Sequence, residues 1–150
     1  MAELWKPHAT VAAIVEDRGR FLMVEEIIDG QQVFNQPAGH LEPNESLIEA
    51  VIRETQEETA RQFTPEYITG IYRWKQPAVD RSFLRFTFSG QCHHYDETQA
   101  LDDGIVRALW MSREELAAHP EKLRSPMVLN CIDDYINGNH YPLDLLIDIH

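Results

Sequence analysis

Glu54, Glu57 and Glu58 lie within about one turn of a predicted helix, and Glu45 precedes them. Like charges three or four residues apart on a helix repel each other. At about 100° per residue, the three carboxylates share an arc of about 100°. Oxygen ligands grouped in this way suit a hard cation such as Mg²⁺. The alternative is an acidic helix face that water and salt screen, and these residues alone leave both interpretations open.

The helix that carries the glutamates is expected to begin near Asn44 or Glu45 and to run to about Arg61. Asn44 is the predicted N-cap, because its side chain can accept a hydrogen bond from the first helical turn. Apolar residues occupy two faces of this helix, and one of these faces continues into the acidic arc. A helix with two apolar faces is expected to pack between layers, which would leave the carboxylates at the edge of a cleft.

Apolar runs before and after this helix predict strands. Residues 8–17 and 20–26 flank Gly19 as a hairpin, and Asp29-Gly30 indicates a second turn. Later strands are predicted at 68–77, 82–95 and 105–111, with a short helix from Ser112 and another that has Ser125 at its N-cap and Gly138 just past its end. Strands and helices do not alternate strictly, so we expect a mixed α+β domain and no doubly wound parallel sheet. Residues 1–150 are expected to form one domain.

The overall charge excludes some classes of function. The chain carries a formal net charge of −12, which argues against a binder of duplex nucleic acid. A small phosphate substrate remains compatible, because divalent cations can supply positive charge locally. We find no apolar run of membrane-spanning length and no signal peptide, and Cys92 and Cys131 are too few for a disulfide framework. A cytoplasmic protein with reduced thiols and no membrane association is expected.

The spacing of these residues resembles that of a known family. Gly39, five residues, Glu45, seven residues, Arg53-Glu54, two residues and Glu57-Glu58 resemble the Nudix box, here at residues 39–60. Three positions depart from the pattern: Thr55 and Arg61 replace aliphatic residues, and Ala60 replaces a glycine. Because alanine forms helix more readily than glycine, the helix is expected to run on or to end differently.

Segments from residue 6 to residue 143, among them FNQPAGHLEPNESL and LRSP, resemble the NudJ-type branch of small bacterial phosphatases in this family. The resemblance implies a Nudix-type α/β/α sandwich with a mixed, mostly antiparallel sheet. It also implies hydrolysis of nucleoside di- and triphosphates or thiamine-pathway pyrophosphates by attack of water on phosphorus. The alternatives are a pyrophosphatase for ADP-ribose or an oxidised nucleotide, or a Nudix-like domain that binds without catalysis.

The same resemblance assigns roles to residues. Glu54, Glu57 and Glu58 would bind Mg²⁺, or Mn²⁺ in its place, together with the backbone carbonyl of Gly39. Either Glu57 or Glu54 would act as the general base. Arg53, four residues before Glu57, would hold that carboxylate in position. The partner would be a small phosphoanhydride substrate, and the protein a monomer or a homodimer.

Other site residues are open to two interpretations. Many family members carry an acid six residues before the late tryptophan, where this chain has Gly104, so Asp103 or Asp102 reaches the site or both only form a turn. Arg85 either faces the substrate phosphates or pairs with a carboxylate, and Gln36 is a candidate for binding a base or a phosphate. Phe34, Trp74 and Phe83 either stack on a substrate ring or belong to the core.

Overall fold

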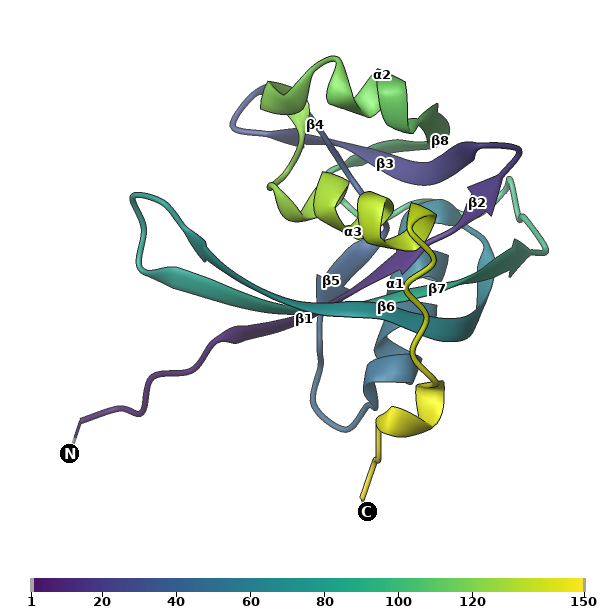
Figure 1. Cartoon of the computed structure of the whole chain (residues 1–150). Helices are drawn as coiled ribbons and strands as arrows, with labels where there is room; N and C mark the ends of the chain where they lie inside the picture. The colour runs from purple at the N-terminus through teal and green to yellow at the C-terminus, as the bar shows by residue number, and fades with distance from the viewer. Residues whose placement is uncertain (1, 150) are drawn as a thin grey trace.

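Two four-stranded sheets form the framework of the protein (Figure 1). The computed structural model describes residues 2–149. The first sheet has the order β5-β1-β7-β6, and β1 and β7 are parallel while the other pairs are antiparallel. Its strands are β1 (His8–Ile14), β5 (Ala38–His40), β6 (Gln62–Gln76) and β7 (Arg81–His93). The second sheet is antiparallel, and β3 lies between β4 and β8. Its strands are β2 (Glu16–Asp17), β3 (Arg20–Ile28), β4 (Gln31–Asn35) and β8 (Ile105–Ser112).

Three α-helices pack on these sheets. Helix α1 (Leu47–Thr59) contacts β1, β5 and β6 of the first sheet and β8 of the second. Helix α3 (Met127–Ile136) lies between the two sheets in Figure 1, and α2 (Arg113–Ala117) packs against α3 and β8. Two 3₁₀ turns, η1 and η2, complete the chain at Pro120–Lys122 and Leu143–Leu145. This arrangement is the α+β sandwich with mixed, mostly antiparallel sheets that the sequence predicted.

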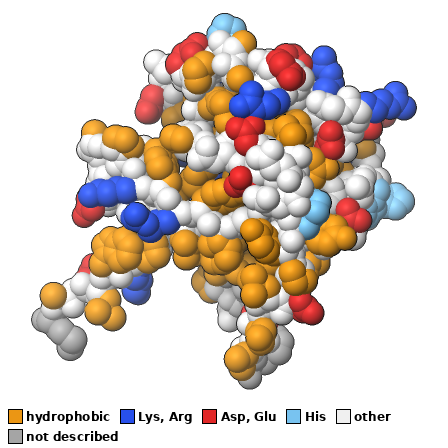
Figure 2. Space-filling view, viewed as in Figure 1, with side chains coloured by type: hydrophobic (Ala, Val, Ile, Leu, Met, Phe, Trp, Pro, Cys, Tyr) orange, Lys and Arg blue, Asp and Glu red, His pale blue; other side chains and the backbone are white. Residues whose placement is uncertain are grey.

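The core has two parts, one on each side of the first sheet. Val51 of α1 packs with Leu22, Phe63 and Phe88 in one cluster. The other cluster joins α2 and α3 to the second sheet. Hydrophobic side chains are also exposed on the face that β6 and the C-terminal segment present in Figure 2. The large ones are Tyr67, Ile71, Tyr141, Leu145 and Ile147.

The predicted turns and strands are present, with one correction at the start of the chain. Arg18-Gly19 and Asp29-Gly30 take positive φ and connect β2 to β3 and β3 to β4. The run at 8–17 is divided at Val15, so that β1 belongs to the first sheet and β2 to the second. The hairpin expected at Gly19 therefore involves only the two-residue strand β2.

The start and end of α1 differ from the prediction. Ser46, not Asn44, is the N-cap: its hydroxyl accepts from the Glu49 amide, and the Glu49 carboxylate accepts from the Ser46 amide. Asn44 lies in the preceding turn with φ of 68°. At the other end, Ala60 takes the left-handed conformation, with φ of 58°, and donates its amide to the Gln56 carbonyl. The helix therefore ends where a glycine would end it, although alanine pays a steric cost there.

The predicted cap of α2 is present, whereas α3 begins one residue later than predicted, with Pro126 at its N-cap position. Ser112 and Glu115 form the expected capping box of α2. The hydroxyl of Ser125 accepts from the Met127 amide at 3.1 Å, so it caps the first turn of α3 although the helix begins at Met127. Among residues 2–149, no helix is long and apolar enough to span a bilayer.

Candidate active site

Helix α1 carries two of its glutamates into the interior. Ala50, Glu54 and Glu58 follow one another at intervals of four residues, so they share the face that packs against the sheet. Ala50 is fully buried, and Glu54 and Glu58 are 9% and 7% exposed. Glu57 is half-buried on the adjacent face. The apolar stripe of the helix therefore ends in carboxylates that are removed from bulk water.

Arg53 holds four carboxylates together. Its Nε and Nη2 donate to the two carboxylate oxygens of Glu45 at 2.9 and 2.8 Å. Its Nη1 donates to Glu54 at 2.9 Å and to Glu57 at 3.2 Å, and lies 3.5 Å from Glu42. The expected contact between Arg53 and Glu57 is therefore present, and Glu45 reaches the group through Arg53. One guanidinium charge against four carboxylates leaves this cluster strongly negative.

The burial of these carboxylates changes their acidity. Burial raises the pKa of Glu58 to about 9, and the charge of Glu54 adds to the effect. Burial likewise raises the pKa of Glu54 to about 7, against the opposing hydrogen bond from Arg53. The pKa of Glu57 is also raised, by burial first and then by the negative charge of Asp102. In the absence of a cation these side chains therefore retain protons that isolated glutamates would have lost.

Strand β5 brings the backbone of the Nudix-like segment against the glutamates. The amide of Ala38 donates to Oε1 of Glu58 at 2.9 Å. Gly39 lies so close to the carboxyl group of Glu54 that a Cβ at this position would clash with it. A side chain at this position would displace the Glu54 carboxyl group, and this close approach places the Gly39 backbone beside the Glu54 carboxylate.

Asp102, and not Asp103, lies beside the glutamates. Carboxylate oxygens of Glu54, Glu57 and Asp102 lie within 4.8 Å of one another. The Asp102 amide donates to the Glu57 carbonyl at 3.1 Å, which fixes the turn against the end of α1. Asp103 is exposed in this turn and belongs to no such cluster among the described residues. The pairing of β3 with β8 shifts register between Glu25 and Glu26, so spacing counted along β8 does not locate the acid.

This donor set fits a divalent cation. The three clustered carboxylates supply hard oxygen ligands, which Mg²⁺ and Mn²⁺ prefer. Glu58 lies outside that cluster of three but lines the same cavity as Glu54 and Gly39. A cation bound here would compensate the negative charge that Arg53 leaves uncompensated.

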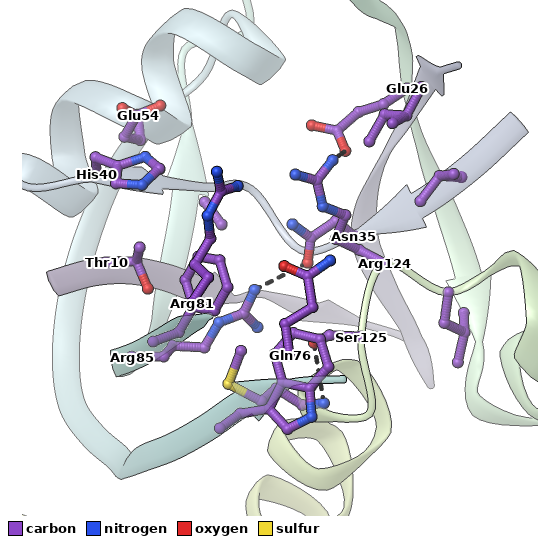
Figure 3. A pocket seen from close by; sticks show the side chains of 18 of the residues that line it. Thr10, Glu26, Asn35, His40, Glu54, Gln76, Arg81, Arg85, Arg124 and Ser125 are labelled. Atoms are coloured by element: carbon purple, nitrogen blue, oxygen red, sulfur yellow. Dashed lines mark hydrogen bonds and ion pairs between the residues drawn. The ribbon is translucent and has the colours of Figure 1, made fainter. Parts of the chain in front are cut away.

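A cavity of about 740 Å³ opens beside Glu54 and Glu58 (Figure 3). Elements of both sheets and the segment before α3 form its walls. In Figure 3, Glu54 and His40 lie on one wall, and Arg81, Arg85 and Arg124 point into the same space. The cavity therefore combines a carboxylate wall with arginine side chains, a combination suited to an anion that also binds a metal ion.

Trp74 and Phe83 line this cavity, whereas Phe34 does not. Trp74 and Phe83 are cross-strand partners on β6 and β7, and their rings stack at 5.8 Å between centroids and 21° between planes. Phe34 packs in the core of the second cluster, which is the second of the two interpretations that the sequence left open. Alternate residues of a strand face opposite sides, so Phe34 points away when its neighbours Val33 and Asn35 face the cavity.

Arg85 lines the cavity and makes no ion pair with a carboxylate of the residues that the structure describes. Its Nη1 donates to Oε1 of Gln36 at 2.9 Å, and its Nη2 donates to Oδ1 of Asn35 at 3.0 Å. Gln36 is buried and donates in turn to the Val128 carbonyl of α3 at 2.8 Å. Gln36 therefore does not line the cavity itself but fixes the Arg85 side chain.

The sequence interpretation did not identify Asn35, Arg81, Arg124 or the Ser125 side chain as parts of the cavity. Asn35 lies next to Gln36 in the quoted segment FNQPAG, and the alternation that excludes Phe34 also selects Asn35. Arg124 and Ser125 fall in the segment LRSP, which the resemblance had already singled out. No local sequence signal distinguishes Arg81, which reaches the cavity from the start of β7.

Comparison with known proteins gives three findings. The model of the family described as NUDIX domain matches residues 6–129. "Phosphatase NudJ" from Escherichia coli K12 is 41% identical over 148 residues, which cover 98% of this chain and 95% of that protein. A solved structure titled "NUDIX hydrolase from Nitrosomonas europaea" has a TM-score of 0.93 and 50% identity, and covers 96% of this chain and 98% of its own.

A more distant structure shares the fold. An ADP-ribose pyrophosphatase from Streptococcus suis has a TM-score of 0.69 at 15% identity, covering 91% of this chain and 96% of its own. At this identity the similarity concerns the fold alone, and specificity must be sought in the residues that line the cavity.

Proposed function

The chain belongs to the Nudix family, and from that premise we propose that it is a metal-dependent phosphatase of nucleoside di- and triphosphates or of thiamine-pathway pyrophosphates. Enzymes of this kind are hydrolases of phosphoanhydride bonds. Hydrolysis adds water across the P–O–P bridge: the water oxygen bonds to one phosphorus, and the bridging oxygen leaves with the other. The alternative of a pyrophosphatase for ADP-ribose has only distant structural similarity in its favour.

The carboxylate wall, by which we mean Glu54 and Glu58 at the cavity with Glu57 and Asp102 beside Glu54, would hold the cation. We assign Glu54, Glu57 and Asp102 as ligands, with Glu58 and the Gly39 carbonyl on the same wall. Mg²⁺ is the proposed ion, with Mn²⁺ as a substitute, because both take oxygen ligands. When bound, such an ion neutralises phosphate charge and acidifies water.

The chain's own groups would perform the remaining work. Arg53 holds the Glu54 and Glu57 carboxylates in fixed positions through its hydrogen bonds at 2.9 and 3.2 Å. Glu57 or Glu54 would accept the proton of the attacking water, as a carboxylate within hydrogen-bond reach of that water can. Trp74 and Phe83 offer an aromatic surface to the part of the substrate beyond its phosphates.

The observation that carries the proposal is the convergence of Glu54 and Glu57 of α1 with Asp102 of the turn before β8, in a cluster whose Glu54 also lines the cavity. A solvated acidic helix face, the alternative interpretation of the sequence, would not bury Glu54 and Glu58. A domain that binds without catalysis would not require a base beside the cation ligands.

The direct test is a screen of nucleoside di- and triphosphates, thiamine-pathway pyrophosphates and ADP-ribose, with products identified and with Mg²⁺ or excess chelator present. We expect orthophosphate release that depends on Mg²⁺. Glu57→Gln should lower kcat by at least about 10²-fold, as expected for loss of a base or a cation ligand. Glu97→Gln, an exposed change of the same kind, should leave kcat unchanged. Full activity of Glu57→Gln, or in chelator, would contradict the proposal.

A further inference from the structure

Arg85 is a buried cation that lacks a counter-charge. Its side chain belongs to a residue only 4% exposed. The partners of its guanidinium are neutral: the side-chain oxygens of Asn35 and Gln36, and the sulfur of Cys131 at 3.9 Å from Nη1. No carboxylate of residues 2–149 lies within ion-pair distance of it. Burial raises the pKa of Glu26 against the charges of Arg124 and Arg85, and the ion pair of Glu26 is with Arg124, at 3.6 Å.

This arrangement is costly unless an anion completes it. A charged group removed from water is stabilised when it is paired and fully hydrogen-bonded, and it is strongly unfavourable otherwise. Arg85 meets neither condition, because its Nε is buried and has no hydrogen-bond partner among the described residues. Two neutral oxygens orient the guanidinium without neutralising it. The side chain is therefore held ready for a negative group that enters from the cavity.

The position of Arg85 limits what that group can be. Arg85 lines the same cavity as Glu54 and Glu58, so an anion bound to it belongs to a ligand that also reaches the carboxylate wall. Behind the guanidinium the space is closed, since Gln36 is 1% exposed and Cys131 is fully buried. A ligand cannot extend through this wall, and a terminal phosphate presents more free oxygens to Arg85 than a phosphate that is bridged on two sides.

We infer that Arg85, held by Asn35 and Gln36, forms the subsite for the terminal phosphate of the substrate. This inference rests on the proposed function and makes it more specific. Substrates whose diphosphate ends in a free phosphate can place that group on Arg85, whereas a diphosphate esterified at both ends cannot. The subsite thus selects for release of orthophosphate over cleavage between two ester-linked phosphates.

Binding of inorganic phosphate, measured by calorimetry in excess chelator, tests the subsite without the metal-dependent reaction. The key variant is Asn35→Asp, which keeps the side-chain shape and puts a negative charge on the atom that already accepts from Arg85 at 3.0 Å. It should weaken phosphate binding by about tenfold or more, the loss expected for one charge-assisted hydrogen bond. Its melting temperature should be no lower than that of the wild type, because Arg85 gains a counter-charge.

Two further variants complete this experiment. Asn130→Asp, an exposed change of the same charge outside the cavity, should bind phosphate as the wild type does. Arg85→Met should abolish the saturable binding. Equal phosphate affinity in the wild type, Asn35→Asp and Arg85→Met would overturn the inference, as would no saturable binding to the wild type.

A kinetic comparison separates this inference from the proposed function. With Mg²⁺, the ratio of kcat/KM for a nucleoside diphosphate to that for ADP-ribose should fall by about tenfold or more in Asn35→Asp. An unchanged ratio in an active variant would refute the subsite and leave the proposed function standing. A wild type that binds phosphate through Arg85 but hydrolyses no nucleoside di- or triphosphate and no thiamine-pathway pyrophosphate would refute the proposed function and retain the subsite.

Discussion

At the scale of single residues, Glu54 and Glu58 show how a helix can turn an apolar face into a binding site. Both occupy positions of the buried stripe that begins with Ala50, and burial raises the pKa of each. Placing carboxylates at core positions is unfavourable for folding in the absence of a cation. This unfavourable burial is accounted for by position: Glu54 and Glu58 also face the cavity, where the chemistry is proposed to take place.

Substitution of Asp102 tests the cation site, and the same substitution at the neighbouring Asp103 is its control. Asp102→Asn should weaken Mn²⁺ binding by at least about tenfold, as for other losses from a metal-binding set. Asp103→Asn removes the same charge from the exposed neighbouring residue, so any long-range charge effect is matched. Calorimetric titration of both variants checks this. Equal weakening in the two would show that Asp102 acts only through its charge.

The raised pKa of Glu58 predicts how stability depends on pH in excess chelator. The Glu58 side chain retains its proton in the folded protein up to a pKa of about 9, whereas in the unfolded chain it loses the proton near the ordinary glutamate pKa of 4.5. Between these values the folded state binds more protons, so stability falls as pH rises, by at most about 1.4 kcal/mol per pH unit for this group.

Glu58→Gln removes this titration and keeps an acceptor for the Ala38 amide. Thermal melts of the wild type and the variant between about pH 5 and pH 9 measure the difference in slope. We expect the wild type to lose stability more steeply than Glu58→Gln. Parallel curves would show that the Glu58 side chain is already ionised in the folded protein.

At the scale of elements, the end of α1 illustrates how tertiary context decides a helix boundary. The sequence favoured continuation through Ala60, because alanine is a good helix former. Instead the left-handed cap forms at Ala60, a buried residue, and the next strand, β6, begins two residues later. The pairing of β6 with the sheet therefore outweighs the preference of alanine for the right-handed helical conformation, which is about 1 kcal/mol.

The end of α1 predicts that replacing alanine by glycine has different effects on stability at Ala60 and at Ala50, two positions of similar burial. Ala60→Gly relieves the cost of the left-handed conformation, while Ala50→Gly places glycine inside the helix. Both lose one buried methyl group. Ala50→Gly should therefore lower the free energy of unfolding by at least about 1 kcal/mol more than Ala60→Gly, as measured by urea denaturation. Equal losses would mean that Ala60 is unstrained.

Elements also explain which site residues the sequence could locate. Residues within α1 were placed correctly relative to one another, because helical spacing fixes which side chains meet, as for Arg53 and Glu57. The sequence left open whether Phe34 contacts the substrate and whether Asp102 or Asp103 reaches the site, because these directions depend on strand facing and on a register shift in the β3–β8 pair. Local periodicity predicts neither the facing of a strand nor a register shift, because strand pairing brings together segments that are distant in sequence.

At the scale of the whole molecule, the cavity arises where the two sheets and the segment before α3 meet. Strand and turn signals were enough to predict the α+β class, and the resemblance to the Nudix family supplied the mixed, mostly antiparallel sheet. They could not predict that Asn35, Arg85 and Arg124 converge, because these residues come from β4, β7 and the segment before α3. The single domain, the cytoplasmic location and the oligomeric state stay predictions.

The acidic character of the whole chain makes the cation central to its function. A protein of net charge −12 repels polyphosphates at long range, and its carboxylate wall repels them at short range. A divalent ion between Glu54, Glu57 and Asp102 would reverse the second effect where the substrate binds. Mn²⁺ and Mg²⁺ titrations of the wild type and of Glu54→Gln, followed by calorimetry, test this account most directly. We predict saturable binding at sub-millimolar concentration to the wild type that is lost in Glu54→Gln. Absence of a saturable site, or undiminished binding in the variant, would contradict it.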